Sequence, residues 1–488
     1  MVMRLPENLD LDKVIQNNLM LYKKMKLNKY KLMFVCDALV KSRAVNWRKM
    51  EESGTTFAPL SSTLLELVVY NYYDYLKFLV AVGVMESDGS FIKGEKCKGY
   101  RFSQIYRGQK LVYRSVDDYK LQKSYKKLLT YLDKKRDKET RGYRYLTHWW
   151  DAGKLKIDEK GALEWIEDYK IRNIQMVKGN KKLNPKKMQE AVRTKIDKAE
   201  DMKTLVLHIN HKGCHYSFSG EGHRFYNPIS NLKSELRNFL TWDGQPLVNI
   251  DIKNSQPYLS LILHDLDFWE KKGKWEGERG LKDEMKEWKR YIDVNRIIMF
   301  LKTAETQAEQ DFPAPNFQLL VSEGNFYSFI QSIWGLHFPE RFADRRKTKK
   351  EVLRLFYCNP EKEDWLDMYA TCDLFKDFFP RTYNLFRMIK TNRYQLLPIL
   401  LQRLESYLVI DVICKRISKM DPTIPMFTIH DNIITTEQHA DVVKKVMEEE
   451  LERYVGYKST LSVEKLGPEK PQHIHQMPTT AAQVQMAA

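Results

Sequence analysis

Residues 247–257 of the sequence are Leu-Val-Asn-Ile-Asp-Ile-Lys-Asn-Ser-Gln-Pro. Residues 426–436 are Met-Phe-Thr-Ile-His-Asp-Asn-Ile-Ile-Thr-Thr. These two stretches are the most informative about the fold. Each places an aspartate at the end of a short apolar run. The first predicts a strand that ends at Asp251 and a following helix with Pro257 in its first turn, where no amide donor is needed. The second predicts a hairpin with Asp431 at its tip, because Asp-Asn favours tight turns.

A basic segment lies between the two aspartates. Residues 341–357 contain neither Pro nor Gly, and residues 358–360 (Cys-Asn-Pro) end the predicted helix. Taken alone, this segment also fits a solvated basic helix, and each aspartate also fits a turn or cap residue. Four side chains advance by four residues along one slowly drifting helical stripe: Arg345, Lys349, Leu353 and Tyr357.

Considered together, the three segments indicate a chemistry. Two carboxylates fixed on a sheet can hold a pair of divalent cations, and a basic helix facing them can hold a triphosphate. These are the minimum requirements for nucleotidyl transfer by two metals.

The composition is consistent with a nucleic-acid partner. The 488 residues include 81 Lys and Arg against 64 Asp and Glu, a net charge of +17, which predicts a polyanionic partner, although lysine-rich solvated surfaces also occur. The six cysteines form no Cys-x-x-Cys pair or disulfide framework, and we find neither a signal peptide nor a long apolar run. We therefore expect a soluble, cytoplasmic protein.

The chain divides by composition and pattern. Residues 1–200 are expected to be mainly helical, from apolar periodicity at 121–132 and 163–171, with basic and aromatic residues interleaved between 126 and 150. That interleaving fits a duplex-binding element or simply the charged outer face of an amphipathic helix. Residues 178–191 resemble a basic linker, and strand-like patterning begins near 204–208.

Several motifs in this order resemble the single-subunit polymerase superfamily of bacterial DNA polymerase I (family A) and the phage-type RNA polymerases. The helix at 397–406 resembles, less closely, the one that precedes motif C, and the likeness covers about 205–455. The matching residues are Asp251 for motif A; Arg345, Lys349 and Tyr357 for motif B; His430 and Asp431 for motif C; and Arg224 with Asn231 for the Arg-led segment before the palm.

The resemblance implies an α+β, right-hand polymerase-like fold with palm and fingers and a mainly helical N-terminal region. The implied domains are a thumb-like, duplex-binding region at 1–200, a first palm part with motif A at 201–265, fingers with motif B at 266–390, a second palm part with motif C at 391–466, and a disordered tail at 467–488.

The implied activity is template-directed addition of nucleotides to a 3′-hydroxyl by a magnesium-dependent transferase. A DNA polymerase of the replication type is favoured, because Gln256 stands where family A DNA polymerases carry Glu and RNA polymerases carry Gly, and it can block a 2′-hydroxyl. The first 200 residues lack the Asp-x-Glu of a proofreading exonuclease. Cys358 replaces the family's usual Gly, and Asn432 and the long gap between motifs A and B look more like the RNA enzymes.

The resemblance also implies roles for individual residues. Asp251, Asp431 and the carbonyl of Ile252 would bind two Mg²⁺, for which Mn²⁺ can substitute. Lys349 would act in catalysis and, with Arg345, would neutralise the phosphates of a dNTP, or of an rNTP in the RNA-polymerase alternative. The remaining expected contacts are Tyr357, Gln256 and Leu353 for the nucleotide, and Arg224, Asn231, Arg403 and His430 for the DNA primer–template or a DNA/RNA template.

Three alternatives remain open from the sequence. A phage-type RNA polymerase or primase would use the same chemistry. A catalytically idle nucleic-acid-binding subunit would use only the fold. A zinc site is conceivable in His208-x-x-His211-x-x-Cys214-His215, although the spacing matches no zinc finger that we can name.

Overall fold

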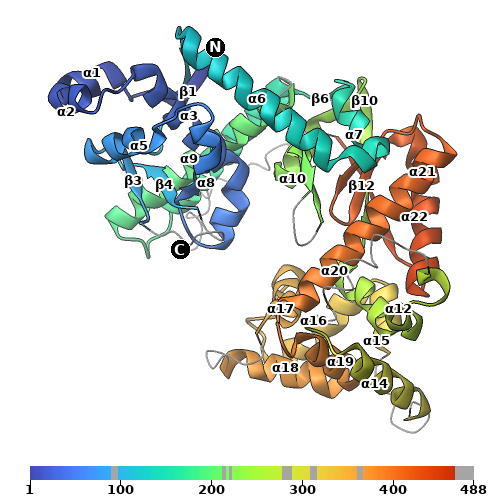
Figure 1. Cartoon of the computed structure of the whole chain (residues 1–488). Helices are drawn as coiled ribbons and strands as arrows, with labels where there is room; N and C mark the ends of the chain where they lie inside the picture. Colours follow the sequence, from blue (N-terminus) through green and yellow to red (C-terminus); the bar gives the residue numbers. More distant parts are fainter. Residues whose placement is uncertain are drawn as a thin grey trace, which may run out of the picture.

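The computed structural model describes residues 1–89, 97–210, 216–218, 223–276, 288, 290–307, 316–359 and 366–467. Within these ranges helices are mixed with antiparallel strands (Figure 1). The tail predicted at 467–488 lies outside them from residue 468 onward. Among the described helices, none is both long enough and apolar enough to cross a membrane.

The N-terminal region up to α6 has a hydrophobic core of its own, built from buried side chains between Met3 and Leu128. Its helices are accompanied by two small sheets, β1–β5 and β2–β4–β3, so it is less purely helical than expected. Helix α6 contains the periodic stretch at 121–132. The elements are β1 (Val2–Pro6), α1 (Leu11–Asn17), α2 (Leu19–Lys24), α3 (Lys29–Glu52), β2 (Ala58–Pro59), α4 (Ser62–Glu66), α5 (Tyr72–Ala81), β3 (Met85–Ser87), β4 (Gly99–Phe102), β5 (Leu111–Ser115) and α6 (Tyr119–Glu139).

The next elements link this region to the main sheet: α7 (Arg144–Asp151), β6 (Leu155–Ile157), α8 (Glu159–Lys178) and α9 (Pro185–Asn210). The strand expected at 204–208 is wrong, and most of the predicted linker at 178–191 is helical. The apolar run belongs to a longer helical period, since Met202, Leu205, Val206 and Ile209 are all buried on one face of α9.

The main sheet centres on β10 (Gln245–Ile252), which confirms the strand predicted at 246–251. Strand β10 pairs with β12 (Asn432–Thr436) and with β13 (Leu461–Leu466), and the order β11–β12–β10–β9–β6 extends the sheet through β11 (Phe427–Ile429) and β9 (Leu240–Trp242). A two-residue turn joins β9 to β10, and both of its residues, Asp243 and Gly244, have positive φ, as a type I′ turn requires.

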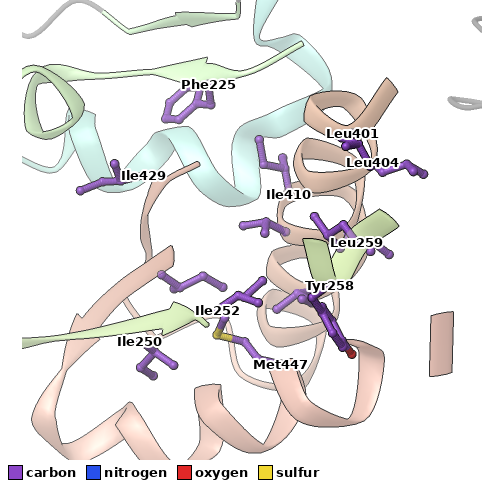
Figure 2. Packing of buried hydrophobic residues seen from close by; sticks show 14 of the residues in the cluster. Phe225, Ile250, Ile252, Tyr258, Leu259, Leu401, Leu404, Ile410, Ile429 and Met447 are labelled. Atoms are coloured by element: carbon purple, nitrogen blue, oxygen red, sulfur yellow. The ribbon is translucent and has the colours of Figure 1, made fainter. Parts of the chain in front are cut away.

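One face of this sheet packs against helices. Ile250 and Ile252 lie in the core near Met447 (Figure 2), and because strand side chains alternate, Asp251 points to the opposite face. Helix α22 (Ala440–Val455) contacts β10 and β12 directly, and a π-helical segment (Tyr407–Cys414) packs against α22. Helices α20 (Leu396–Ser406) and α21 (Lys415–Met420) flank that segment, and α11 (Ser255–Leu259) packs against α20.

A helical group rich in aromatic residues lies at the end of α20 away from the sheet (Figure 1). Phe317, Phe326, Phe375 and Phe379 contact one another in its interior. The helices are α12 (Leu266–Glu270), α14 (Val294–Gln307), α15 (Phe317–Ser322), α16 (Phe326–His337), α17 (Arg345–Tyr357), α18 (Leu366–Phe378) and α19 (Pro380–Lys390).

Candidate active site

The two aspartates meet because β10 and β12 are neighbours. Asp251 is the register partner of Asn432, which directly follows Asp431, and on its other side Asp251 pairs with Ser462. The turn between β11 and β12 consists of His430 and Asp431, and His430 has a φ of 57°, in the left-handed region that tight turns use. The predicted hairpin, with Asp431 at its tip, is therefore confirmed.

The electrostatics of the pair follow from this proximity. Burial, and next the charge of Asp431, raise the pKa of Asp251 to about 7. Burial likewise raises the pKa of Asp431, whereas Lys349 and a hydrogen bond from Ser255 lower it. Lys349 also lowers the pKa of Asp251, so one ammonium group acts on both carboxylates.

Helix α17 presents a basic groove. It begins at Arg345, four residues later than predicted, because the Asp344 side chain caps it by accepting from the amide of Lys347 at 2.8 Å. Lys349, Leu353 and Tyr357 line one cavity of about 360 Å³ together with Arg346, Lys350 and Arg354.

Arg345 does not line this groove. Its Nη1 donates to Ser328 Oγ at 3.3 Å, and its charge acts on the buried phenol of Tyr327, as that of Asp431 does. The structure thus keeps three of the four predicted stripe residues together. It adds Tyr327 as a neighbour that the sequence reasoning missed.

Glu405 is the centre of a buried polar cluster beside the carboxylates. It accepts from Arg224 Nη2 at 2.7 Å and from Gln256 Nε2 at 2.8 Å, and Ser255 Oγ lies 3.5 Å away. Burial raises the pKa of Glu405 to about 7, against the opposing charge of Arg224. The sequence reasoning did not single out Glu405, although an ionisable residue next to Leu404 on an otherwise apolar helix face was the available signal.

The segment that contains Arg224 is fixed to the hairpin. Asn227 caps α10 (Pro228–Asn231) in a capping box and also donates from Nδ2 to the Thr428 carbonyl at 2.7 Å. The Tyr226 ring meets the His430 ring edge to face, with centroids 5.8 Å apart. Burial, followed by the charge of Arg224, lowers the pKa of His430 to about 3, which keeps the imidazole neutral.

The side chains of three predicted site residues are not grouped around the two carboxylates. Asn231 is at the end of α10, where its carbonyl accepts from Trp47 Nε1 at 2.8 Å. Arg403 is buried in α20, and its charge acts on His223. The Ile252 side chain is in the core, so only its backbone carbonyl is suited to bind a cation.

Tyr357 lies at the edge of the polar cluster. Its hydroxyl accepts from Gln402 Nε2 at 3.4 Å, and its ring is 39% exposed. Burial raises the pKa of Tyr357, and the charges of Arg224 and Glu405 also act on it. The end of α17 therefore lies against the Arg224–Glu405–Gln256 cluster.

Several buried polar atoms around the pair have no hydrogen-bond partner within the described ranges. They are both side-chain polar atoms of Asn254, Gln256 Oε1, His430 Nδ1 and Asn432 Oδ1. Buried groups of this kind are normally satisfied, and their concentration at one place is typical of a site that binds a polar ligand.

The proposed zinc motif is largely outside the described residues, because His211, Cys214 and His215 belong to the range 211–215, whereas His208 lies in α9. In the part of the chain that the structure describes, no three His, Cys, Asp or Glu side chains are grouped to hold a metal ion. A cation at Asp251 and Asp431 would therefore need backbone, ligand or solvent oxygens as well.

No protein-family model matches the chain, and no curated protein matches it. Among solved structures, the polymerase domain of Pol1 from M. smegmatis, in complex with DNA primer-template and dNTP, is similar with a TM-score of 0.38 and 11% sequence identity. The match covers 71% of this chain and 73% of that chain. A likeness of this size does not by itself assign a fold family or a function.

Proposed function

We propose that this chain is a template-directed nucleotidyltransferase that adds nucleotides to a 3′-hydroxyl, with DNA as the favoured product. One observation carries the proposal: Asp251 at the end of β10 meets Asp431 in the adjacent β11–β12 turn, and Lys349 of the basic helix acts on both. Burial raises the pKa of both carboxylates, and the charge of Asp431 further raises that of Asp251, so the ionised pair is costly to maintain without a use for the charge.

The pair suits two Mg²⁺ ions, because hard cations prefer carboxylate oxygens and keep part of their water shell. Asp251 and Asp431 would hold them with the Ile252 carbonyl. The unsatisfied Asn432 Oδ1 supports a polar ligand at this place. When bound, the ions would supply activation of the 3′-hydroxyl and neutralisation of the leaving pyrophosphate.

The groove on α17 would receive the incoming nucleotide. Lys349 would neutralise phosphate charge and donate a proton to the pyrophosphate, while Arg345 would add charge at the start of the helix. Leu353 and Tyr357 would contact base and sugar. Gln256, held by Glu405 through its amide nitrogen, would limit the room at the 2′ position.

The remaining predicted contacts would orient the primer–template. Arg224, positioned by Glu405, and the neutral His430 lie beside the carboxylates, whereas Asn231 ends α10 and Arg403 is buried in α20. In this proposal the main sheet and α20–α22 form the palm, α12–α19 form the fingers, and the region before α7 contacts the duplex.

Primer extension tests the proposal. A labelled primer–template with Mg²⁺ would be given dNTPs or rNTPs separately, beside Asp251→Asn, Asp431→Asn and the exposed control Asp441→Asn. Extension with dNTPs that is lost only in the first two variants supports a DNA polymerase. Extension with rNTPs makes the chain an RNA polymerase or primase. Binding without extension by the wild type would instead favour an idle nucleic-acid-binding subunit.

A further inference from the structure

Two arginines from distant parts of the sequence converge on one backbone oxygen near the carboxylates. Arg48 Nη2 donates to the Leu232 carbonyl at 2.6 Å, and Arg237 Nη2 donates to the same oxygen at 3.5 Å. Arg48 belongs to α3, whereas Arg237 belongs to the 3₁₀ segment Ser234–Phe239 that leads into β9. Neither residue was singled out by any sequence motif.

Contacts between the helices hold the two arginines close together, because their like charges would otherwise push them apart. On α3, Arg43 binds Asp201 at 2.6 Å and Asp197 at 3.1 Å, both on α9. One turn further along α3, Trp47 Nε1 donates to the Asn231 carbonyl at 2.8 Å. The Arg48 guanidinium then lies 5.2 Å from the Trp47 ring centroid, which limits its freedom.

The two guanidinium groups lack a close counterion. Among the described residues neither has a carboxylate within salt-bridge distance, and Arg237 Nε is buried without an acceptor. Burial lowers the pKa of Arg48, and burial together with the charge of Arg48 lowers the pKa of Arg237 to about 10. Glu51 and Glu52 act on Arg48 and Asp251, Glu235 and Glu464 act on Arg237, but none of them lies within salt-bridge distance. An anion bound by both guanidinium groups would relieve the unfavourable effect of Arg48 on Arg237.

The pair also lies near the candidate active site. The 3₁₀ segment that carries Arg237 contacts β13, and β13 pairs with β10 beside Asp251, whose charge acts on Arg237. Helices α3 and α17 belong to separate parts of the molecule (Figure 1), so the carboxylates receive positive charge from two independent elements. In the proposed function the basic side chains along α17 receive the free nucleotide, which leaves a different anion for the arginine pair.

We propose that Arg48 and Arg237 bind a backbone phosphodiester of the nucleic-acid strand whose 3′ end reaches Asp251. This inference rests on the proposed function and deepens it by assigning part of the N-terminal region to that strand. Guanidinium groups suit the role because they present forked donors to phosphate oxygens and stay charged when partly buried. The contact would set the position of the strand without reading its sequence.

Binding in the absence of catalysis tests the assignment. Fluorescence anisotropy with a labelled primer–template, in EDTA and without nucleotide, would be measured over a range of salt concentrations. The variants are Arg48→Gln, Arg237→Gln and the charge-preserving Arg48→Lys and Arg237→Lys. Arg296→Gln on α14 is the matched control, since it removes the same charge from an exposed position in another part of the molecule.

We expect each Gln variant to weaken binding roughly tenfold and to reduce the slope of log K against log salt by about 0.9, the value for one lost phosphate contact on a duplex. Each Lys variant should retain most of the slope, and Arg296→Gln should match the wild type. An unchanged slope in both Gln variants would overturn the proposal, whether or not their melting temperatures fall, because it would mean that these arginines only brace Leu232.

The source of the phosphate is tested separately. If the Gln variants bind the primer–template normally but lose affinity for a fluorescent dNTP, the pair belongs to the nucleotide site and the strand assignment is wrong. The proposed function fails differently: a wild type that binds the primer–template with the expected arginine-dependent slope but never extends it would refute the polymerase while supporting this site.

Discussion

Asp251, at the end of β10, is the direct cross-strand partner of Asn432, and Asp431 directly precedes Asn432 in the turn between β11 and β12. The turn thus brings a second carboxylate next to Asp251 at the end of the sheet. Burial and the charge of Asp431 raise the pKa of Asp251 to about 7, so ionising both carboxylates at once is energetically unfavourable. Several consequences can be measured.

Replacement of Asp251 by Asn should abolish activity without harming the fold. We expect primer extension to fall by about 10³-fold or more, because one cation ligand is lost. The metal-free melting temperature should stay equal or rise, since a buried charge repelled by Asp431 is removed. Differential scanning fluorimetry and extension assays check the two parts. A loss of activity that merely parallels a large drop in melting temperature would contradict this role.

The metal-free protein should lose stability as the pH rises from about 4 to about 7. The pKa of an aspartate in an unfolded chain is about 4, whereas the pKa of Asp251 in the folded protein is about 7. Between these pH values the folded state therefore binds one proton that the unfolded state has released. Deprotonation then costs the folded state more than the unfolded one. Glu405, with its pKa raised to about 7, acts in the same direction.

Melting temperatures in EDTA at a series of pH values would show this decline. It should be shallower in Asp251→Asn and in Glu405→Gln. Mg²⁺ should raise the melting temperature more at pH 8 than at pH 5, because protons compete with the cations for the carboxylates. A stability that rises through this interval in EDTA would show that the pair is not coupled as described.

Lys349→Ala should slow nucleotide addition by about 100-fold, which is the usual order for loss of one charged donor to the transition state. Lys347→Ala is the matched control, since Lys347 lies on the same helix but donates to the Glu340 carbonyl at 3.2 Å and does not line the groove. The control should remain within about twofold of wild type in single-turnover assays. Equal losses in both variants would point to a general effect of charge.

Glu405→Ala should destabilise the protein by about 3 kcal/mol, because it leaves Arg224 partly buried without its partner. Urea unfolding measures this loss of stability.

Gln256→Ala should spare stability and instead raise the use of rNTPs relative to dNTPs by roughly tenfold, if the side chain limits room at the 2′ position. Competition between labelled nucleotides measures this preference. An unchanged sugar preference would remove Gln256 from the gate.

Cys358 should be the most reactive thiol among those described. A hydrogen bond from Cys372 and the nearby Lys390 ammonium lower its pKa to about 6, although burial alone would raise it, and Lys390 Nζ lies 3.6 Å from its Sγ. Iodoacetamide at pH 7 should modify Cys358 faster than the exposed Cys97, and the rate should fall below pH 6. Lys390→Ala should slow the reaction.

Peptide mass spectrometry after short labelling times would follow each thiol separately. Cys36 and Cys414 serve as internal controls, because burial raises the pKa of both and keeps them unreactive. Labelling of Cys36 before Cys358 would contradict the contact between Cys358 and Lys390.

Short-range sequence patterns were enough to predict the local elements around the site. Alternation and apolar runs define β10 and the β11–β12 hairpin, and a four-residue period without Pro or Gly defines α17. These features depend on short-range physics: side-chain period, turn chemistry and capping. The same local view failed at 204–208, where an apolar run at the end of α9 was taken for a strand, because five residues cannot distinguish the two periods.

The distant residues that share the site come together only when the chain folds. The contact of Arg224 and Gln256 with Glu405 spans 181 and 149 residues of the chain, and that of Trp47 with Asn231 spans 184. No local pattern encodes such pairings, because they form only when α20 packs against α11 and α3 packs against α9. The burial that gives Asp251, Asp431 and Glu405 their raised pKa values, and that brings Arg48 beside Arg237, exists only once those surfaces are in contact.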